Sequence, residues 1–193
     1  ATKTVTAEIV AFALIAASVG DIGLSDEHWA ALPDQVAEVV NDLEPSRELA
    51  GWLAGADHRF ATVARGLLYG AAAECALKVE ETTSILSTGF SSADLRHGPI
   101  AIASTGIPIL ALAHPGPASE DVLELVTELR RRGAAVRLAG PVPGNSVDWP
   151  ERAPEAFAPV LAVVRGQQLA LELARRLGLD PDSPRGLTKV TIT

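Results

Sequence analysis

The sequence predicts an α/β protein in which a mostly parallel sheet lies between two layers of helices. A short helical segment precedes this α/β domain in the chain. The main observation is a buried strand at residues 60–64, a turn at Arg65-Gly66 and a helix from Tyr69 to about Ser84. A strand, a glycine turn and a helix form the first unit of a parallel α/β sheet. Two more apolar strands, at 108–113 and 135–139, support the same architecture.

The first fifty residues are predicted to be helical, and residues 51–193 to form the α/β domain. Residues 5–19 are an alanine-rich helix that Gly20 ends, and Ser25 is a candidate N-cap for the next helix. Pro33 is expected to interrupt or restart that helix. It continues to about Leu43, and a third helix runs from Pro45 to Leu53.

The second half of the chain supplies the other helices. Ser119 is a candidate cap for a helix over 120–132, whose first turn is acidic and whose last turn is basic, as the helix dipole favours. Residues 140–159 contain five prolines and are expected to be a connection with one edge strand around Ala156. A long helix over 160–177 ends at Gly178, and the tail that follows is irregular.

Composition excludes several classes of function. The net charge of −8 argues against nucleic acid as the main partner, and 48% hydrophobic content argues against disorder. The single cysteine, Cys75, excludes an internal disulfide, so the cytoplasm is the default location. The apolar run Ile9–Val19 is too short to span a bilayer and is expected to be a buried helix, so no membrane partner is predicted. Four scattered histidines predict no metal site, and no cofactor motif is present.

Three charged residues stand on an otherwise apolar helix. Glu74, Lys78 and Glu81 are spaced i, i+4 and i+7, so their side chains share one face. Such Glu–Lys pairs often only stabilise an exposed helix surface. Here the neighbours are alanine and leucine, which leaves a narrow polar stripe. A stripe of this kind favours a cavity or a subunit interface.

Two further residues could carry proton or carbonyl chemistry. His97 precedes Gly98-Pro99 in a turn of defined shape, where it is either simply exposed or able to transfer protons near neutral pH. Lys189 lies near the end of the chain, where it is either a solvated charge or, held in a pocket, a nucleophile for a carbonyl.

At these residues the chain resembles the sugar isomerase (SIS) domain family. The likeness is greatest to the second SIS domain of glucosamine-fructose-6-phosphate aminotransferase and of its double-SIS relatives, the aminosugar-phosphate deaminases and ketose/aldose isomerases. It extends from about residue 58 to the end. The motifs that carry it are Arg65-Gly66, Glu74 to Glu81, Leu95-Arg96-His97-Gly98-Pro99, and Asp182 to Lys189.

The resemblance implies a flavodoxin-like fold and a role for each matching position. Glu81 would move a proton between C1 and C2 of a hexose or hexosamine 6-phosphate, with aldose–ketose isomerisation coupled to amination or deamination. His97 would assist ring opening, in the active site of a neighbouring subunit of a homodimer. Lys189 would contact the open-chain carbonyl. Substrate-binding roles would fall to Lys78, Arg65, Gly66 and Thr188.

The sequence also departs from the family. No serine- and threonine-rich phosphate loop and no glutaminase domain is found, so the chain is expected to be part of a longer protein and to be inactive without a first SIS domain. Asp94 stands where the family usually has glutamate. The alternative is a sugar-phosphate-binding module of a regulatory protein, which has no need of Glu81, His97 and Lys189 together.

Overall fold

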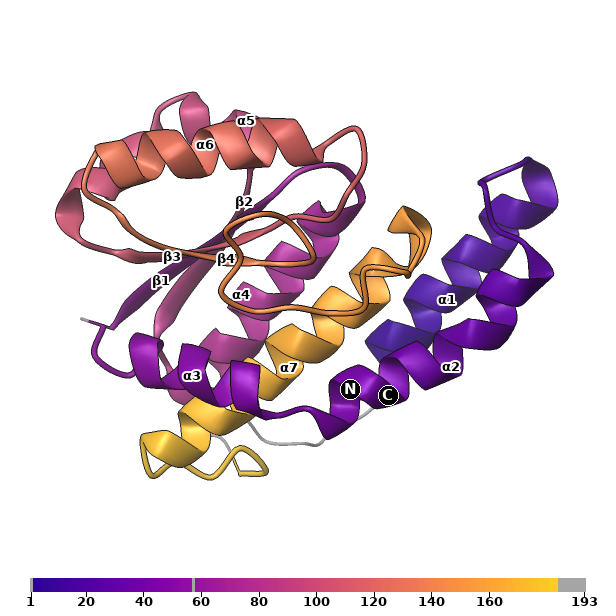
Figure 1. Ribbon diagram of the computed structural model, residues 1–193. Helices are drawn as coiled ribbons and strands as arrows, with labels where there is room; N and C mark the ends of the chain where they lie inside the picture. Colours follow the sequence, from indigo (N-terminus) through magenta and orange to yellow (C-terminus); the bar gives the residue numbers. More distant parts are fainter. Residues whose placement is uncertain (1, 57, 184–193) are drawn as a thin grey trace, which may run out of the picture.

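The computed structural model describes residues 2–56 and 58–183, and its centre is a parallel sheet of four strands (Figure 1). The strands are β1 (Arg59–Ala64), β2 (Leu86–Ser91), β3 (Pro108–Leu112) and β4 (Ala135–Ala139), in the order β2-β1-β3-β4. Each neighbouring pair is parallel, with Arg59 opposite Leu86 and Pro108 opposite Ala135 in register. The predicted parallel α/β sheet is therefore confirmed.

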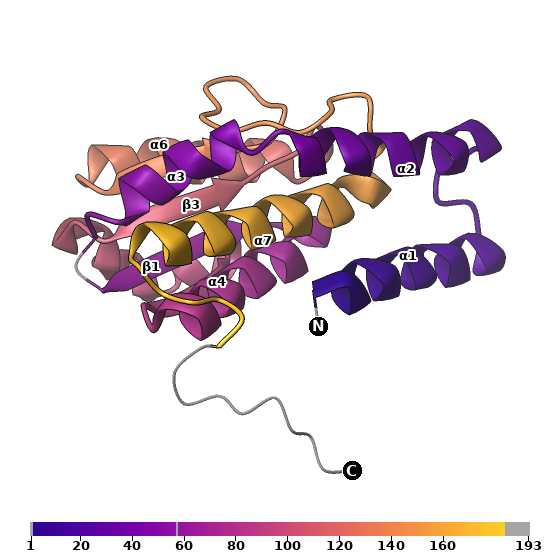
Figure 2. The ribbon, with the colours of Figure 1, turned by 90° about the horizontal axis from the view of Figure 1, so that it is seen from below.

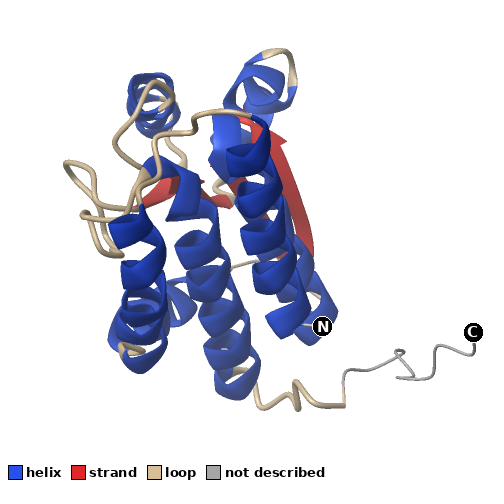
Figure 3. Cartoon of the chain, turned by 90° about the vertical axis from the view of Figure 1, so that its right-hand side faces the viewer, coloured by secondary structure: helices blue, strands red, loops and turns tan. Residues whose placement is uncertain are grey.

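Helices cover both faces of the sheet (Figures 1 and 3). The α4 (Tyr69–Thr83) and α7 (Ala158–Arg176) helices lie on one face, while α5 (Ser92–Arg96) and α6 (Ser119–Arg131) lie on the other. In the central strand β1, Phe60 and Ala64 face the first layer, and Ala61 and Val63 face the second. This alternation with period two makes the three-layer sandwich. The described residues also form the 3₁₀ segments η1 (Gly66–Leu68), η2 (Pro99–Thr105) and η3 (Glu155–Phe157).

The opening helices are α1 (Thr2–Val19), α2 (Asp26–Asn41) and α3 (Glu44–Leu53), and two of them belong to the core. Val39 of α2 and Leu49 and Leu53 of α3 are buried in the same hydrophobic cluster as α7. Ser25 caps α2 as predicted, because its side chain accepts a hydrogen bond from the His28 amide. Figure 2 shows α2 and α3 along α7, with α1 at the end of the helical layer.

The first helix departs from its prediction in one respect. It forms, but no residue of α1 is buried, so the expectation of a buried helix is wrong for the single chain. It also begins earlier than the apolar run, and its 18 residues are long and apolar enough to cross a membrane. That test concerns length and composition only, and a helix from a protein core passes it as well.

Gly89 and Gly166 allow β2 and α7 to pack very closely against α4. A Cβ on Gly89 of β2 would lie 2.6 Å from Cα of Ala73, and a Cβ on Gly166 of α7 would lie 2.9 Å from Cβ of Cys75. Both distances are shorter than van der Waals contact allows. The sheet and α7 therefore approach α4 more closely than any larger residue would permit.

The structure corrects four sequence predictions. A strand, β2, and the short helix α5 occupy residues 86–96, where the sequence analysis assigned none. The edge strand expected around Ala156 is wrong, because that segment is the 3₁₀ turn η3. Ser119 is the first residue of α6 and not its cap, and its hydroxyl donates to the carbonyl of Gly116. Pro33 lies inside α2, which continues through it.

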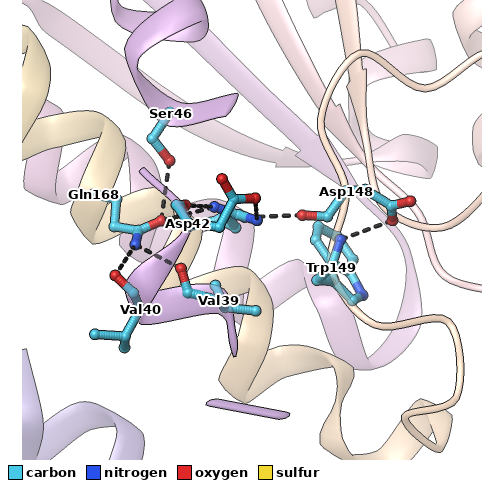
Figure 4. A network of polar contacts seen from close by, with 8 residues as sticks. Val39, Val40, Asp42, Ser46, Asp148, Trp149 and Gln168 are labelled. Atoms are coloured by element: carbon cyan, nitrogen blue, oxygen red, sulfur yellow. Dashed lines mark hydrogen bonds and ion pairs between the residues drawn. The ribbon is translucent and has the colours of Figure 1, made fainter. Parts of the chain in front are cut away.

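A buried arginine joins α2, α7 and the connection after β4. Arg165 of α7 donates from Nε to the carbonyl of Asp148 at 2.8 Å, and from Nη2 to the carboxylate of Asp42 at 3.0 Å. Its Nη1 also donates to the carbonyl of Asp42. Gln168, one turn later, donates to the carbonyls of Val39 and Val40 (Figure 4). Arg165 and Gln168 thus donate hydrogen bonds to carbonyls at the end of α2, which have no partner within that helix.

Candidate active site

The charged residues of α4 form the chemical feature that the sequence predicted, and they are named here the charged stripe: Glu74, Lys78 and Glu81. Nζ of Lys78 lies 2.5 Å from Oε2 of Glu81 and 3.7 Å from Oε1 of Glu74. The side chains of Glu74 and Lys78 are each only 15% exposed, while that of Glu81 is 38% exposed. The stripe is thus half-buried and unlike the exposed pairs of a surface helix.

The stripe has a cavity at each end. Glu74 lines an apolar cavity of about 800 Å³ between α1, α4 and α7, and its Oε1 atom is buried without a hydrogen-bond donor. Glu81 lines a smaller cavity of about 280 Å³ at the end of α4, together with Gly178 to Asp180 and Ser183. This placement agrees with the prediction that a narrow polar stripe faces a cavity.

The cysteine beside the stripe is inert. Cys75 is buried against α7, and burial raises the pKa of its thiol to about 12, with a smaller contribution from the charge of Glu74. Because the thiolate is the reactive form, this cysteine has no part in nucleophilic chemistry at neutral pH.

Arg65 and Gly66 do not meet the charged stripe within the chain. They follow β1 at the carboxyl edge of the sheet, where Gly66 has φ of +60° and Arg65 is exposed. Glu81 lies near the opposite end of α4, roughly 20 Å away at the helical rise per residue. From the carboxyl edge, the chain after β1 continues to β2 on one side, and the chain after β3 continues to β4 on the other side. Parallel α/β sheets usually bind ligands at such a point between two strands.

His97 is also distant from Glu81. It follows α5, beyond the carboxyl end of β2, and it is exposed. Glu81 precedes the amino end of that strand, so the six residues of β2 separate the two by roughly 20 Å. The remaining predicted site residues, Thr188 and Lys189, lie outside the described residues.

Sequence reasoning missed the group that positions the turn before His97. Asp121 of α6 accepts hydrogen bonds from Ser92 and from Nη1 of Arg96, the latter at 2.6 Å. Partial burial opposes ionisation of Asp121, but these hydrogen bonds and the arginine charges together lower its pKa. In the sequence, Asp121 is visible only as an acid in the first turn of a predicted helix. The fold is needed to show that α5 packs opposite Asp121.

His114 is a buried structural residue. Its Nδ1 accepts a hydrogen bond from the indole Nε1 of Trp149 at 3.1 Å, and its Nε2 lies 2.9 Å from the carbonyl of Ala153. This pattern fits the neutral ring, with the proton on Nε2. Burial lowers the pKa of His114, against smaller opposing effects of the Ala153 carbonyl and nearby carboxylates.

We expect this histidine to make the protein less stable in mild acid. The unfolded chain takes up a proton near pH 6.5, whereas the folded ring resists it until a lower pH. Stability is therefore complete above pH 6.5 and falls below it, by at most about 1.4 kcal/mol per pH unit. Chemical denaturation of wild type, His114→Gln and the exposed-site control His97→Gln at pH 7.5 and 5.5 measures this. If wild type and His114→Gln lose equal stability, the assignment is wrong.

No group of three or more metal-ligating side chains that could hold a metal ion occurs within residues 2–56 and 58–183.

Comparison with known proteins agrees with the fold and the motifs. Residues 53–139 match the SIS domain. The chain is 32% identical over 197 residues to glutamine–fructose-6-phosphate aminotransferase (isomerizing) from Methanothermobacter thermautotrophicus, which covers 98% of the chain and 33% of the relative. The enzyme of the same name from Pyrococcus horikoshii is 33% identical over 201 residues, with 98% and 33% covered. The chain thus spans about a third of the length of these curated relatives.

Solved structures give the same result. The C-terminal domain of glucosamine-fructose-6-phosphate aminotransferase from Francisella tularensis superposes with a TM-score of 0.73 at 25% identity, covering 81% of this chain and 46% of that one. Glucosamine-6-phosphate deaminase from Thermotoga maritima shares the fold, with a TM-score of 0.65 at 24% identity over 87% of this chain and 50% of that one. Residues 53–139 therefore match the SIS domain family, and the superposed structures share the fold of the chain.

Proposed function

We propose that this chain is the C-terminal SIS half of an enzyme that isomerises a hexose or hexosamine 6-phosphate between aldose and ketose, coupled to gain or loss of an amino group. The observation that carries the proposal is the charged stripe, in which Lys78 lies between two carboxylates on a half-buried helix face. The names of the matched relatives state that those enzymes act on fructose 6-phosphate.

In this proposal Glu81 is the base. Isomerisation requires a group that removes a proton from one of two adjacent carbons and returns it to the other. The carboxylate of Glu81 is the most exposed member of the stripe, so it is the one that a substrate could reach. Lys78 would hold it in position through their 2.5 Å contact, and Glu74 would hold Lys78 in turn.

Chain length allows Lys189 to join this site. Ser183 lines the same cavity as Glu81, and Lys189 is six positions further along the chain. Six residues span at most about 20 Å, so the reach of the backbone includes the carboxylate. Lys189 would then contact the open-chain carbonyl of the sugar, and Thr188 would contact the substrate beside it.

The separation of the other residues indicates a site shared between domains or subunits. His97 and the Arg65-Gly66 turn lie roughly 20 Å from Glu81, too far to touch the same hexose. We therefore propose that His97 assists ring opening in the site of a second subunit, and that Arg65 and Gly66 contact phosphate at the carboxyl edge. Residues 1–50 would form an interface segment, and residues 51–193 the SIS domain of a cytoplasmic homodimer without metal or cofactor.

Exchange of a carbon-bound proton tests the proposal directly. The protein as its gene encodes it is incubated in deuterated water with fructose 6-phosphate or glucosamine 6-phosphate, and deuterium at C1 or C2 is measured by NMR. Incorporation above the rate without enzyme is the expected result. Binding of either sugar phosphate without any incorporation would contradict it.

The same outcome would favour a second function, a non-catalytic module that binds a sugar phosphate and regulates another protein. One observation supports this alternative: within the described residues, the chain does not assemble Glu81, His97 and Arg65 into a single pocket.

A further inference from the structure

The short helix α5, which carries His97 at its end, depends on its neighbours for its position. It has only five residues, and an isolated helix of that length is not stable in water. Ser91 caps its start, because the Ser91 hydroxyl accepts a hydrogen bond from the amide of Asp94 at 3.1 Å. Leu95 is buried in the hydrophobic cluster between the sheet and α6. The place of His97 is therefore set by whatever holds α5.

A single carboxylate of the neighbouring helix α6 holds both ends of α5 (Figure 1). Asp121 accepts one hydrogen bond from the hydroxyl of Ser92, the first residue of α5. It accepts another, at 2.6 Å, from Nη1 of Arg96, the last residue of α5. Nη2 of Arg96 also donates to the backbone carbonyl of Asp121 at 2.9 Å. Two nitrogens on one residue fix the plane of the guanidinium as well as its distance.

Asp121 itself belongs to a firmly packed element. It is the third residue of α6, a helix of 13 residues, and the positive end of the helix dipole favours an acid there. The next residue, Val122, and Leu125 are both buried in the same cluster as Leu95. The carboxylate is thus a fixed point against which α5 is held.

The backbone around His97 passes this restraint on to the histidine. The His97 amide donates to the carbonyl of Asp94 at 3.1 Å, which ties the residue to α5. Gly98 follows with φ of +136°, a conformation that favours glycine, so the chain leaves α5 at a sharp angle. Loosening α5 would therefore change the direction in which the exposed ring of His97 points.

We propose that Asp121 is a positioning residue for His97, acting through Ser92 and Arg96 and not on the substrate itself. The inference rests on the proposed function, in which His97 assists ring opening, and it adds a residue that lies outside all of the family motifs. It also assigns Arg96 to holding α5, since both of its terminal nitrogens are bound to Asp121.

Hydrogen exchange measured by NMR tests the structural part without any substrate. Asp121→Asn keeps the shape of the side chain but removes the charge that strengthens its hydrogen bonds about twofold. We expect the amide of His97 to exchange at least about tenfold faster. Glu120→Gln, an exposed neighbour in the same turn, should leave that rate unchanged. An unchanged His97 rate in Asp121→Asn, or equally faster exchange at the buried Leu129 of α6, would overturn the inference.

A double-mutant cycle tests the catalytic part. In the deuterium assay with glucosamine 6-phosphate, Asp121→Asn should lower kcat about tenfold and change KM less than about twofold. In a His97→Gln background the same substitution should lower kcat by less than about twofold, because its effect passes through His97. A tenfold loss in both backgrounds would show that Asp121 acts independently of His97.

The two measurements separate this inference from the proposed function. A wild type without deuterium incorporation would contradict the proposed function, while the exchange rate of the His97 amide would still support or overturn the role of Asp121 in holding α5.

Discussion

Replacing Arg165 by methionine is expected to lower the free energy of unfolding by about 2–4 kcal/mol. The substitution keeps much of the apolar stem but removes every donor of the guanidinium. It leaves the carbonyls of Asp42 and Asp148 without this donor, and the Asp42 carboxylate without its ion pair. Buried carbonyls that lose their donor are costly, whereas the Asp42 carboxylate, whose side chain is 51% exposed, can be solvated by water.

The matched control is Arg175→Met on the same helix. Arg175 is 59% exposed and pairs with Glu172 at 2.9 Å, so its loss should cost less than about 1 kcal/mol. Urea denaturation at pH 7.5 gives both values, and the melting temperature should fall by roughly 10 °C for Arg165→Met alone. Equal losses for the two variants would show that the network contributes little to stability.

Replacing Glu81 by glutamine is expected to lower the turnover of the proposed isomerisation by at least about 100-fold. Glutamine has nearly the same shape and still accepts a hydrogen bond from Lys78, but it cannot take a proton from carbon. The fold should be unaffected because the side chain is part-exposed. The deuterium exchange assay measures the loss in the protein as its gene encodes it.

Glu80→Gln is the control for this change. Glu80 is the preceding residue of α4, is exposed, and points away from the stripe, so its variant should retain the wild-type rate. Similar rates for Glu81→Gln and wild type would exclude Glu81 as the base, whatever the overall reaction proves to be. Loss in both variants would point to a general effect on the helix.

The sequence alone predicted the layers of the fold and the charged stripe because both depend on local periodicity. The strands at 60–64 and 108–113 are apolar apart from Thr62, as expected for strands that are buried on both faces. Glu74, Lys78 and Glu81 share a face for the geometric reason that three or four residues make a helical turn.

What the sequence could not predict depends on contacts between distant segments. The strand β2 has the sequence Leu-Ser-Thr-Gly-Phe-Ser, which has little apolar content, and its pairing with β1 makes it a strand. In the sequence, Arg165 looks like an ordinary charged residue on a long helix. Its buried contacts with Asp42 and Asp148 depend on how the fold packs α2 and the connection after β4 against α7. The Ser92–Asp121 contact likewise joins the first turns of α5 and α6, which are 29 residues apart in the sequence.

The glycines at 89 and 166 fix the direction in which the charged stripe points. They fit α4 between β2 and α7 so closely that the helix has little freedom to rotate about its own axis. A rotation of 20° would move a carboxylate at the helix surface by roughly 2 Å. Displacements of about 1 Å can cost a hundredfold in rate. Substitutions at these two positions should therefore slow the proposed isomerisation from a distance, by changing the orientation of Glu81 without touching it.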